Sequence, residues 1–201
     1  AVCKGYLDML DIHNEKKLKK YIPIVKEEIN RTLILMDDFL DYTKIKIEKE
    51  ELDLCFLLEE MEESLKSLFK EKNIVSRFCI PETEIYILGD YNRLKQVLIN
   101  LLKNAVEAKD EQKSDSFLWV FTEEEKDTIS IIIEDNGIGM DQETLSHISE
   151  MFFTTKKRGS GLGVGLSKEI IELHQGSLIY QSEKGKGTRV KLTLPKEENM
   201  T

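Results

Sequence analysis

Hydrophobic residues in the first fifty positions follow a helical period. Apolar and small side chains recur in alternating steps of four and three, and Tyr21, Leu33 and Leu40 widen the resulting stripe. The stripe consists of Leu18, Ile22, Val25, Ile29, Thr32, Met36, Phe39 and Thr43. This spacing predicts an amphipathic helix of about 30 residues with near-heptad packing. Asn14 is suited to cap the first turn, and Pro23 is expected to kink the helix.

A shorter helix is predicted to precede this one. Residues 1–10 place their apolar side chains on one helical face, and residues 11–14 form a polar turn. Two antiparallel helices cannot cover both of their apolar faces by themselves. A dimeric four-helix bundle is therefore the expected completion.

Beyond residue 50 the hydrophobic pattern alternates between strand-like and helix-like segments. Strands are predicted at 51–54, 74–80, 84–88, 117–122, 128–134, 177–182 and 188–194, and helices at 56–70, 90–108, 142–150 and 162–173. The order lacks the regular alternation of a parallel sheet, so the pattern predicts an α+β fold built as a two-layer sandwich. Trp119 and the Phe and Met residues at strand or helix spacing are expected in its core.

Composition narrows the function classes. The chain has 201 residues and a net charge of −9, which argues against nucleic-acid binding. No apolar run is long enough to span a membrane, and no signal peptide opens the chain. The chain does not begin with Met, so an upstream part is expected to be missing. Cys3, Cys55 and Cys79 are widely spaced and are expected to be reduced thiols.

Four glycine- or asparagine-centred motifs follow one another along the second domain. Each alone has an ordinary explanation, such as a turn or a solvated helix face, but their occurrence in this order indicates a functional site. They are Asn100-Leu-Leu-Lys-Asn104 after Asp90-x-x-Arg93, Asp135-Asn-Gly137-Ile-Gly139, Gly159-Ser-Gly161-Leu-Gly163, and Gly185-Lys-Gly187-Thr188. A P-loop is absent from the sequence, and the run at 159–165 does not fit the dinucleotide-binding spacing.

The four motifs resemble the N, G1, G2 and G3 boxes of sensor histidine kinases, and Phe152-Phe153-Thr154-Thr155-Lys156 stands where the F box belongs. The short F box is most similar to that of the sporulation-phosphorelay and nitrogen-regulation kinases. The resemblance implies a Bergerat ATP-binding sandwich, shared with gyrase, heat-shock-ninety and mismatch-repair ATPases. It also implies ATP and Mg²⁺ as cofactors.

The resemblance assigns roles to individual residues. Asn104, with Asn100 one turn earlier on the same helix face, is the implied metal ligand, since an amide oxygen suits Mg²⁺. Asp135 is the implied base-selecting residue, because an ionised carboxylate accepts a hydrogen bond from the amino group of adenine. Gly137 and Gly139 would let the backbone approach the ring.

The glycine run and its surroundings are the implied phosphate-binding part. The glycines precede a helix whose free N–H groups can receive phosphate oxygens, and Lys156, Lys157 and Arg158 are expected to belong to a lid that meets the triphosphate. Thr188 either contacts the nucleotide or holds the start of its strand. The remaining residues assigned to the site are Thr154, Thr155, Gly159, Ser160, Gly161, Leu162 and Gly163.

Asn100 separates two function classes. Related ATPases carry a Glu at this position as the base that activates water, and an amide cannot take that role. Phosphotransfer to histidine is therefore favoured over ATP hydrolysis. Glu107, on the same helix, is the alternative base, although a surface carboxylate beside Lys103 is the simpler interpretation.

The phospho-accepting histidine is expected in an H box upstream of Ala1. His13 falls in the predicted turn and His147 on a polar helix. His174 ends a helix, where a cation suits the helix dipole and Gly176 can act as the C-cap. No residue of this chain is therefore assigned as the phosphoacceptor.

The sequence thus predicts three parts: the C-terminal part of a dimerisation and phosphotransfer hairpin at 1–48, a complete ATP-binding domain at 51–196, and a tail at 197–201. The expected function is that of a protein-histidine kinase in a two-component system or phosphorelay. The alternatives are an ATPase of the same fold and a nucleotide-dependent interaction module without kinase activity. A second copy, a response regulator and a small protein inhibitor are the expected partners. This portion is expected in the cytoplasm, and any membrane anchor would lie upstream.

Overall fold

The computed structural model of the chain describes residues 5–7, 9, 14–43, 45–156 and 159–196. Most of the predicted first helix, the turn with His13, the basic residues Lys157 and Arg158, and the tail at 197–201 lie outside the described residues. The predictions made for them therefore stay predictions.

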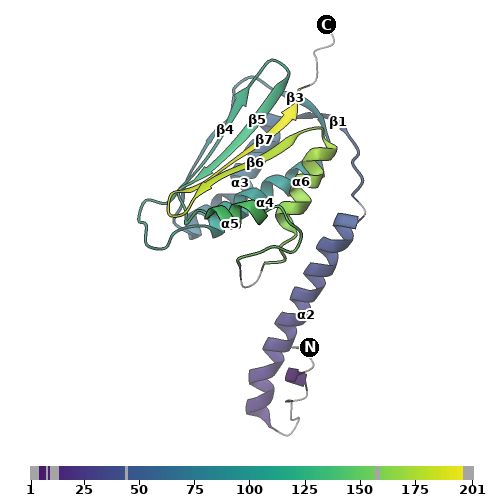
Figure 1. Cartoon of the computed structure of the whole chain (residues 1–201), viewed down its shortest axis with the longest axis vertical. Helices are drawn as coiled ribbons and strands as arrows, with labels where there is room; N and C mark the ends of the chain where they lie inside the picture. The colour runs from purple at the N-terminus through teal and green to yellow at the C-terminus, as the bar shows by residue number, and fades with distance from the viewer. Residues whose placement is uncertain (1–4, 8, 10–13, 44, 157–158, 197–201) are drawn as a thin grey trace.

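The long amphipathic helix is present as α2 (Glu15–Thr43). Asn14 caps it as predicted, because its Oδ1 accepts the Lys17 N–H at 3.2 Å. The helix continues through Pro23 without a break. It extends away from the rest of the molecule (Figure 1). Of the predicted stripe, Ile22, Ile29 and Met36 are exposed, whereas Val25 is buried. The ring of Tyr6 lies 5.8 Å from that of Tyr21, which brings the chain before α2 back onto the helix.

A five-stranded mixed sheet forms one layer of the second domain, in the order β2-β4-β5-β7-β6. In this sheet β2 and β4 pair in parallel and the other neighbours are antiparallel. The pairs β4–β5 and β6–β7 are hairpins. The strands are β2 (Val75–Cys79), β4 (Phe117–Glu124), β5 (Thr128–Asp135), β6 (Ser177–Glu183) and β7 (Gly187–Pro195). A separate pair is formed by β1 (Glu50–Asp53) and β3 (Tyr86–Gly89).

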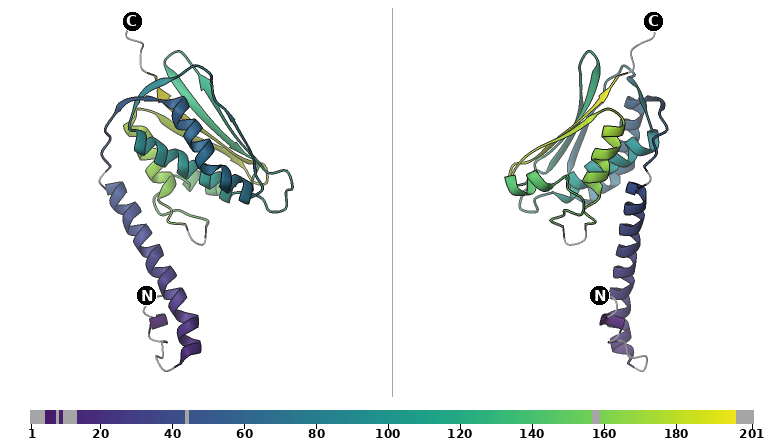
Figure 2. Two further views of the ribbon diagram at one scale, coloured as in Figure 1. Left: turned by 180° about the vertical axis from the view of Figure 1, so that it is seen from behind. Right: turned by 45° about the vertical axis from the view of Figure 1, so that its right-hand side comes forward.

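Helices α3 (Leu54–Glu71), α4 (Tyr91–Glu107) and α6 (Gly163–Leu173) cover one face of this sheet, and the other face is open (Figures 1 and 2). The α+β two-layer sandwich is thereby confirmed. Buried Leu, Ile and Val side chains of both layers form one continuous core. The short α5 (Gln142–His147) ends earlier than predicted, because the chain turns where the Glu150 N–H donates to His147 O.

Trp119 does not lie in the core, contrary to the prediction. It is 42% exposed and stacks on Phe117, with ring centroids 4.5 Å apart. The strand alternation is correct, but it places both side chains on the sheet face that no helix covers. Period alone cannot distinguish the covered face from the open one.

Asp90 joins three segments at one corner of the sandwich. Its carboxylate caps α4 by accepting the Arg93 N–H and also accepts the N–H of Glu48, in the connection from α2. Its own N–H donates to His174 Nε2 at 2.9 Å. Although burial opposes it, the hydrogen bonds from Glu48 and Arg93 keep the pKa of Asp90 below its ordinary value. The end of α6, the start of α4 and the connection from α2 are thus held together.

His174 is neutral, which corrects the prediction that it acts as a cation at the end of α6. It is 1% exposed, and burial lowers its pKa. Because Nε2 accepts a hydrogen bond, the proton lies on Nδ1, which donates to Ile170 O. The left-handed position after the helix is taken by Gln175 (φ 61°), whereas Gly176 is needed because a Cβ there would lie 2.3 Å from Thr193 O.

Candidate nucleotide site

Asn100 and Asn104 lie one turn apart on α4, on the side that faces the start of α6. The Asn100 side chain donates to Ser167 Oγ at 2.9 Å, and a Cβ on Gly163 would lie only 2.5 Å from its Oδ1. Asn104 Nδ2 approaches Asn100 Oδ1 at 3.4 Å. Asn100 therefore holds α6 against α4, and Asn104 is left to present its oxygen outward.

Lys156 contacts that oxygen. Its ammonium donates to Asn104 Oδ1 at 2.7 Å and forms an ion pair with Glu107. The partner of Glu107 is thus the lysine of the predicted lid, not Lys103 as expected from helix spacing. In this state a positive charge already lies against the predicted metal ligand.

Asp135 ends β5 with its side chain toward the helical layer. Its Oδ1 accepts the Gly137 N–H at 2.8 Å, and it also accepts the N–H of Thr188 from the neighbouring strand. Burial raises the pKa of Asp135 to about 6, against these hydrogen bonds and the charge of Lys113. The carboxylate is therefore mainly ionised at neutral pH, and it protonates in mild acid.

The loop after Asp135 passes close to other backbone on both sides. A Cβ on Gly137 would lie 2.2 Å from Ala108 O at the end of α4, and one on Gly139 (φ 59°) would lie 2.0 Å from Glu183 O. Glycine is required at both positions. The loop is thereby fixed between α4 and the β6–β7 turn, with Asp135 at its base.

The lid segment (residues 152–162) leads into α6. Its described part folds on itself: Phe152 N–H donates to Gly161 O, and Lys156 N–H donates to Thr154 Oγ1. Gly161 adopts φ 70° against the Phe152 backbone. Leu162 precedes α6 without a side-chain cap, so the first N–H groups of the helix are available to an anion.

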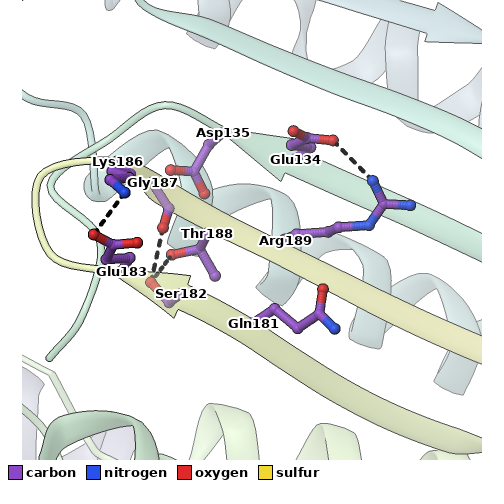
Figure 3. A pocket seen from close by; sticks show the side chains of 9 residues that line it. All are labelled: Glu134, Asp135, Gln181, Ser182, Glu183, Lys186, Gly187, Thr188 and Arg189. Carbon is purple, nitrogen blue, oxygen red and sulfur yellow. Dashed lines mark hydrogen bonds and ion pairs between the residues drawn. The ribbon is translucent and has the colours of Figure 1, made fainter. Parts of the chain in front are cut away.

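A depression of about 330 Å³ lies at the β6–β7 turn (Figure 3). It contains Asp135 and Thr188 but no residue of α4 or α6, so it borders only the base end of the predicted site. Thr188 Oγ1 is 3.0 Å from Ser182 Oγ, which donates to Gly187 O. The depression is lined by Glu134, Asp135, Gln181, Ser182, Glu183, Lys186, Gly187, Thr188 and Arg189.

The structure brings the predicted residues together in two groups. One is the base end around Asp135, Gly137, Gly139 and Thr188. The other is the phosphate end, where Lys156 of the lid segment contacts Asn104 and the start of α6 contacts Asn100. Three polar contacts were missed from sequence: Ser167 with Asn100, Ser182 with the Met140 N–H, and Lys113 with the loop after Asp135. None belongs to a motif whose spacing could have pointed to it.

The comparison with known families agrees with this geometry. The profile described as "Histidine kinase-, DNA gyrase B-, and HSP90-like ATPase" matches residues 89–198, more than half of the chain. The chain therefore belongs to this family of ATP-binding domains. No helix in the described residues is long and apolar enough to cross a membrane.

Individual relatives are sporulation and sensor kinases. The chain is 35% identical to Sporulation kinase A of Bacillus subtilis (strain 168), over 96% of this chain and 32% of that protein. It is 32% identical to Sporulation kinase E of the same organism, over 98% of this chain and 26% of that protein. The chain thus spans about a third or less of these two relatives.

Solved histidine kinases have the same fold. The catalytic domain of histidine kinase ThkA superposes with a TM-score of 0.66 at 29% identity, over 74% of this chain and 96% of that domain. ThkA in complex with response regulator protein TrrA superposes with a TM-score of 0.74 at 25% identity, over 100% of this chain and 58% of that one.

Proposed function

We propose that residues 51–196 form the ATP-binding domain of a sensor protein-histidine kinase and that 1–48 belong to its dimerisation and phosphotransfer hairpin. The whole protein would transfer the γ-phosphoryl of ATP to an H-box histidine and then to a response-regulator aspartate. The names of the sporulation kinases and the ThkA complex support this proposal. The hairpin would pair with a second copy and offer a surface to the regulator or a small protein inhibitor.

The placement of Asp135 carries the proposal. The carboxylate is 7% exposed and is held by two backbone N–H groups at the end of β5. While ionised it can only accept hydrogen bonds, so it selects the amino group of adenine over the carbonyl of guanine. The loop that follows, in which Gly137 and Gly139 are required by neighbouring backbone, holds the carboxylate in this place.

Asn104 fits the role of a Mg²⁺ ligand, because its oxygen already binds a cation, the Lys156 ammonium, next to the Glu107 carboxylate. Mg²⁺, when bound there with ATP, would neutralise charge on the phosphates. The proposed site comprises Asn100, Asn104, Asp135, Gly137, Gly139, Thr154, Thr155, Lys156, Lys157, Gly159, Ser160, Gly161, Leu162, Gly163 and Thr188.

Asn100 supports phosphotransfer over ATP hydrolysis. Its amide group is bonded to Ser167 and lies against Gly163, and it has no basic lone pair with which to activate water. The domain would position the nucleotide and neutralise its charge, which accounts for most of phosphoryl-transfer catalysis.

Calorimetry with MgATP tests the site. We expect binding by the chain, and loss of about tenfold or more in affinity for Asn104→Ala and Asp135→Ala. Unchanged binding in both variants would contradict the assignment. Thermal unfolding of each variant separates a lost contact from a lost fold.

Radiolabelling tests the reaction. We expect this chain to bind MgATP without labelling itself, because none of its three histidines, His13, His147 and His174, lies in an H box. His174 is also buried and hydrogen-bonded. The protein extended upstream through the H box should acquire acid-labile label. Phosphohistidine on His13, His147 or His174 would overturn this expectation. Steady ATP hydrolysis by this chain alone would contradict the kinase proposal and favour an ATPase.

A further inference from the structure

Three backbone segments meet at the base end of the site. Ile138 N–H donates to Ala108 O at the end of α4, at 2.8 Å, and Gly185 N–H in the β6–β7 turn donates to Ile138 O at 2.7 Å. The loop after Asp135 is thus the middle layer between a helix end and a turn. Its position decides where the Asp135 carboxylate and the glycine backbone face a bound base.

Lys113 binds two of these segments from a fourth, the connection between α4 and β4. Its ammonium donates to Asn136 O at 2.7 Å and to Gly185 O at 3.0 Å. The Asn136 side chain also binds the connection that carries Lys113. It donates to Asp115 O and accepts a hydrogen bond from the Phe117 N–H. One ammonium therefore joins the loop after Asp135 to the β6–β7 turn.

The ammonium also acts through its charge. The two carbonyl oxygens to which it donates are neutral, so no carboxylate at these contacts offsets its charge. The charge of Lys113 lowers the pKa of the Asp135 carboxyl, and the charge of Glu134, the preceding residue, raises it. Lys113 thus favours the ionised carboxylate that burial disfavours.

We propose that Lys113 is a positioning residue for the nucleotide base: it clamps the loop after Asp135 onto the β6–β7 turn and keeps Asp135 ready to accept a hydrogen bond from adenine. The inference rests on the proposed function of Asp135. Lys113 acts through the loop and its charge and does not itself touch the nucleotide.

Calorimetry of MgATP binding at about pH 6 and about pH 8.5 tests this role. The Asp135 carboxyl, whose pKa is about 6, is only partly ionised at the lower pH and is ionised at the higher pH. We expect Lys113→Met to weaken binding about tenfold at the lower pH and only about two- to threefold at the higher pH. Lys113→Arg keeps the charge and should restore most of the low-pH affinity. ATP protonation is common to all variants and cancels in the comparison.

Lys109→Met is the matched control. Lys109 lies in the same segment but pairs with Glu111, at 3.2 Å. The Lys109→Met protein should therefore bind MgATP like the unaltered chain at both pH values. A loss that is equal at both pH values for Lys113→Met, or one that Lys113→Arg does not relieve, would reduce Lys113 to a structural lysine and overturn the proposal.

Carboxyl NMR of the nucleotide-free protein separates this inference from the proposed function. We expect Asp135 to titrate at higher pH in Lys113→Met than in the unaltered chain or in Lys109→Met. An unchanged titration overturns the charge coupling. A chain that shows the expected titration but binds no MgATP overturns the proposed function and the positioning role together, leaving only the coupling.

Discussion

Asp135 carries two opposing requirements at the scale of a single residue. In its proposed role it must be buried to face a base without competing water, and it must be ionised to accept a hydrogen bond. Burial raises its pKa to about 6, while the N–H groups of Gly137 and Thr188 and the Lys113 charge oppose the rise. As a result the carboxylate is ionised at neutral pH, but its pKa lies only about one unit below neutral.

MgATP affinity should therefore depend on pH in mild acid. Since the binding form is the carboxylate, affinity should be constant above about pH 7 and fall as the pH drops through about 6, up to about tenfold per unit. Calorimetry across this range, with ATP and its own protonation measured separately, checks the expectation. Asp135→Asn should bind weakly at every pH, and an unaltered chain with a flat profile would contradict the role of Asp135.

Sequence reasoning reached the residues that lie in motifs and missed those that do not. Asn104, Asp135 and the glycines have recognisable spacing, because each backbone approach needs glycine at a defined place. Lys113 and Ser182 act through backbone carbonyls and N–H groups of segments far away in the chain. Many polar side chains can make such contacts, so no sequence pattern predicts which residues make them.

At the scale of elements, His174 connects the two helices that hold the phosphate end. Its Nε2 accepts the Asp90 N–H, so a proton on this nitrogen would break the link between α6 and α4. Burial holds the pKa of His174 below its ordinary 6.5, so unfolded chains bind the proton more tightly than folded ones. His174 therefore contributes stability that is complete above about pH 6.5 and declines as the pH falls.

His174→Gln should lower the free energy of unfolding by about 1–3 kcal/mol at neutral pH, because it leaves the Asp90 N–H poorly bonded. The difference from the unaltered chain should shrink toward about pH 5, where the histidine protonates on unfolding. Urea unfolding at both pH values measures it. The raised pKa of Asp135 makes stability change with pH in the opposite direction, but equally in both proteins. If the difference in unfolding free energy between the two proteins did not depend on pH, the hydrogen bond from Asp90 to a neutral His174 would be contradicted.

The ion pair between Glu107 and Lys156 should restrain the lid segment in the nucleotide-free protein. Glu107→Gln removes the charge and should make trypsin cleave after Lys156 several times faster, since proteolysis reports local opening. Glu111→Gln, whose partner Lys109 lies away from the lid, is the control. Equal cleavage rates in all three proteins would show that the pair does not hold the lid.

Helices and strands were predictable to within a few residues because their hydrophobic periods are strong. Which strands become neighbours was less accessible: β2 pairs with β4 in parallel, and β3 leaves the main sheet to pair with β1. Those pairings join segments far apart in sequence. The open face of the sheet, and with it the exposure of Trp119, follows from that topology and not from local pattern.

At the scale of the whole molecule, α2 leaves much of its described apolar stripe exposed, although Val25 is buried. Ile29 and Leu33 are 48% and 53% exposed. We expect the chain to be a dimer through this helix. The Asp90 corner would then transmit the position of α2 to α4, because the connection at Glu48 is hydrogen-bonded there.

Ile29→Glu combined with Leu33→Glu should give a monomer in sedimentation equilibrium, because burying two carboxylates in a bundle core is strongly unfavourable. MgATP affinity should be unchanged. Lys26→Gln, an exposed change on the same helix, should leave the association state as it is. A monomeric unaltered chain, or a variant that still dimerises, would contradict the bundle.

The contact between Lys156 and Asn104 gives the resting protein its own counterion. If MgATP binds as proposed, Mg²⁺ would replace the Lys156 ammonium at the Asn104 oxygen, and the released ammonium would be free to face the phosphates. Binding would then exchange one cation for another within the site and would displace few ions from the surrounding solution. Added salt should consequently have less influence on affinity than it has at sites whose basic groups stand ready in water.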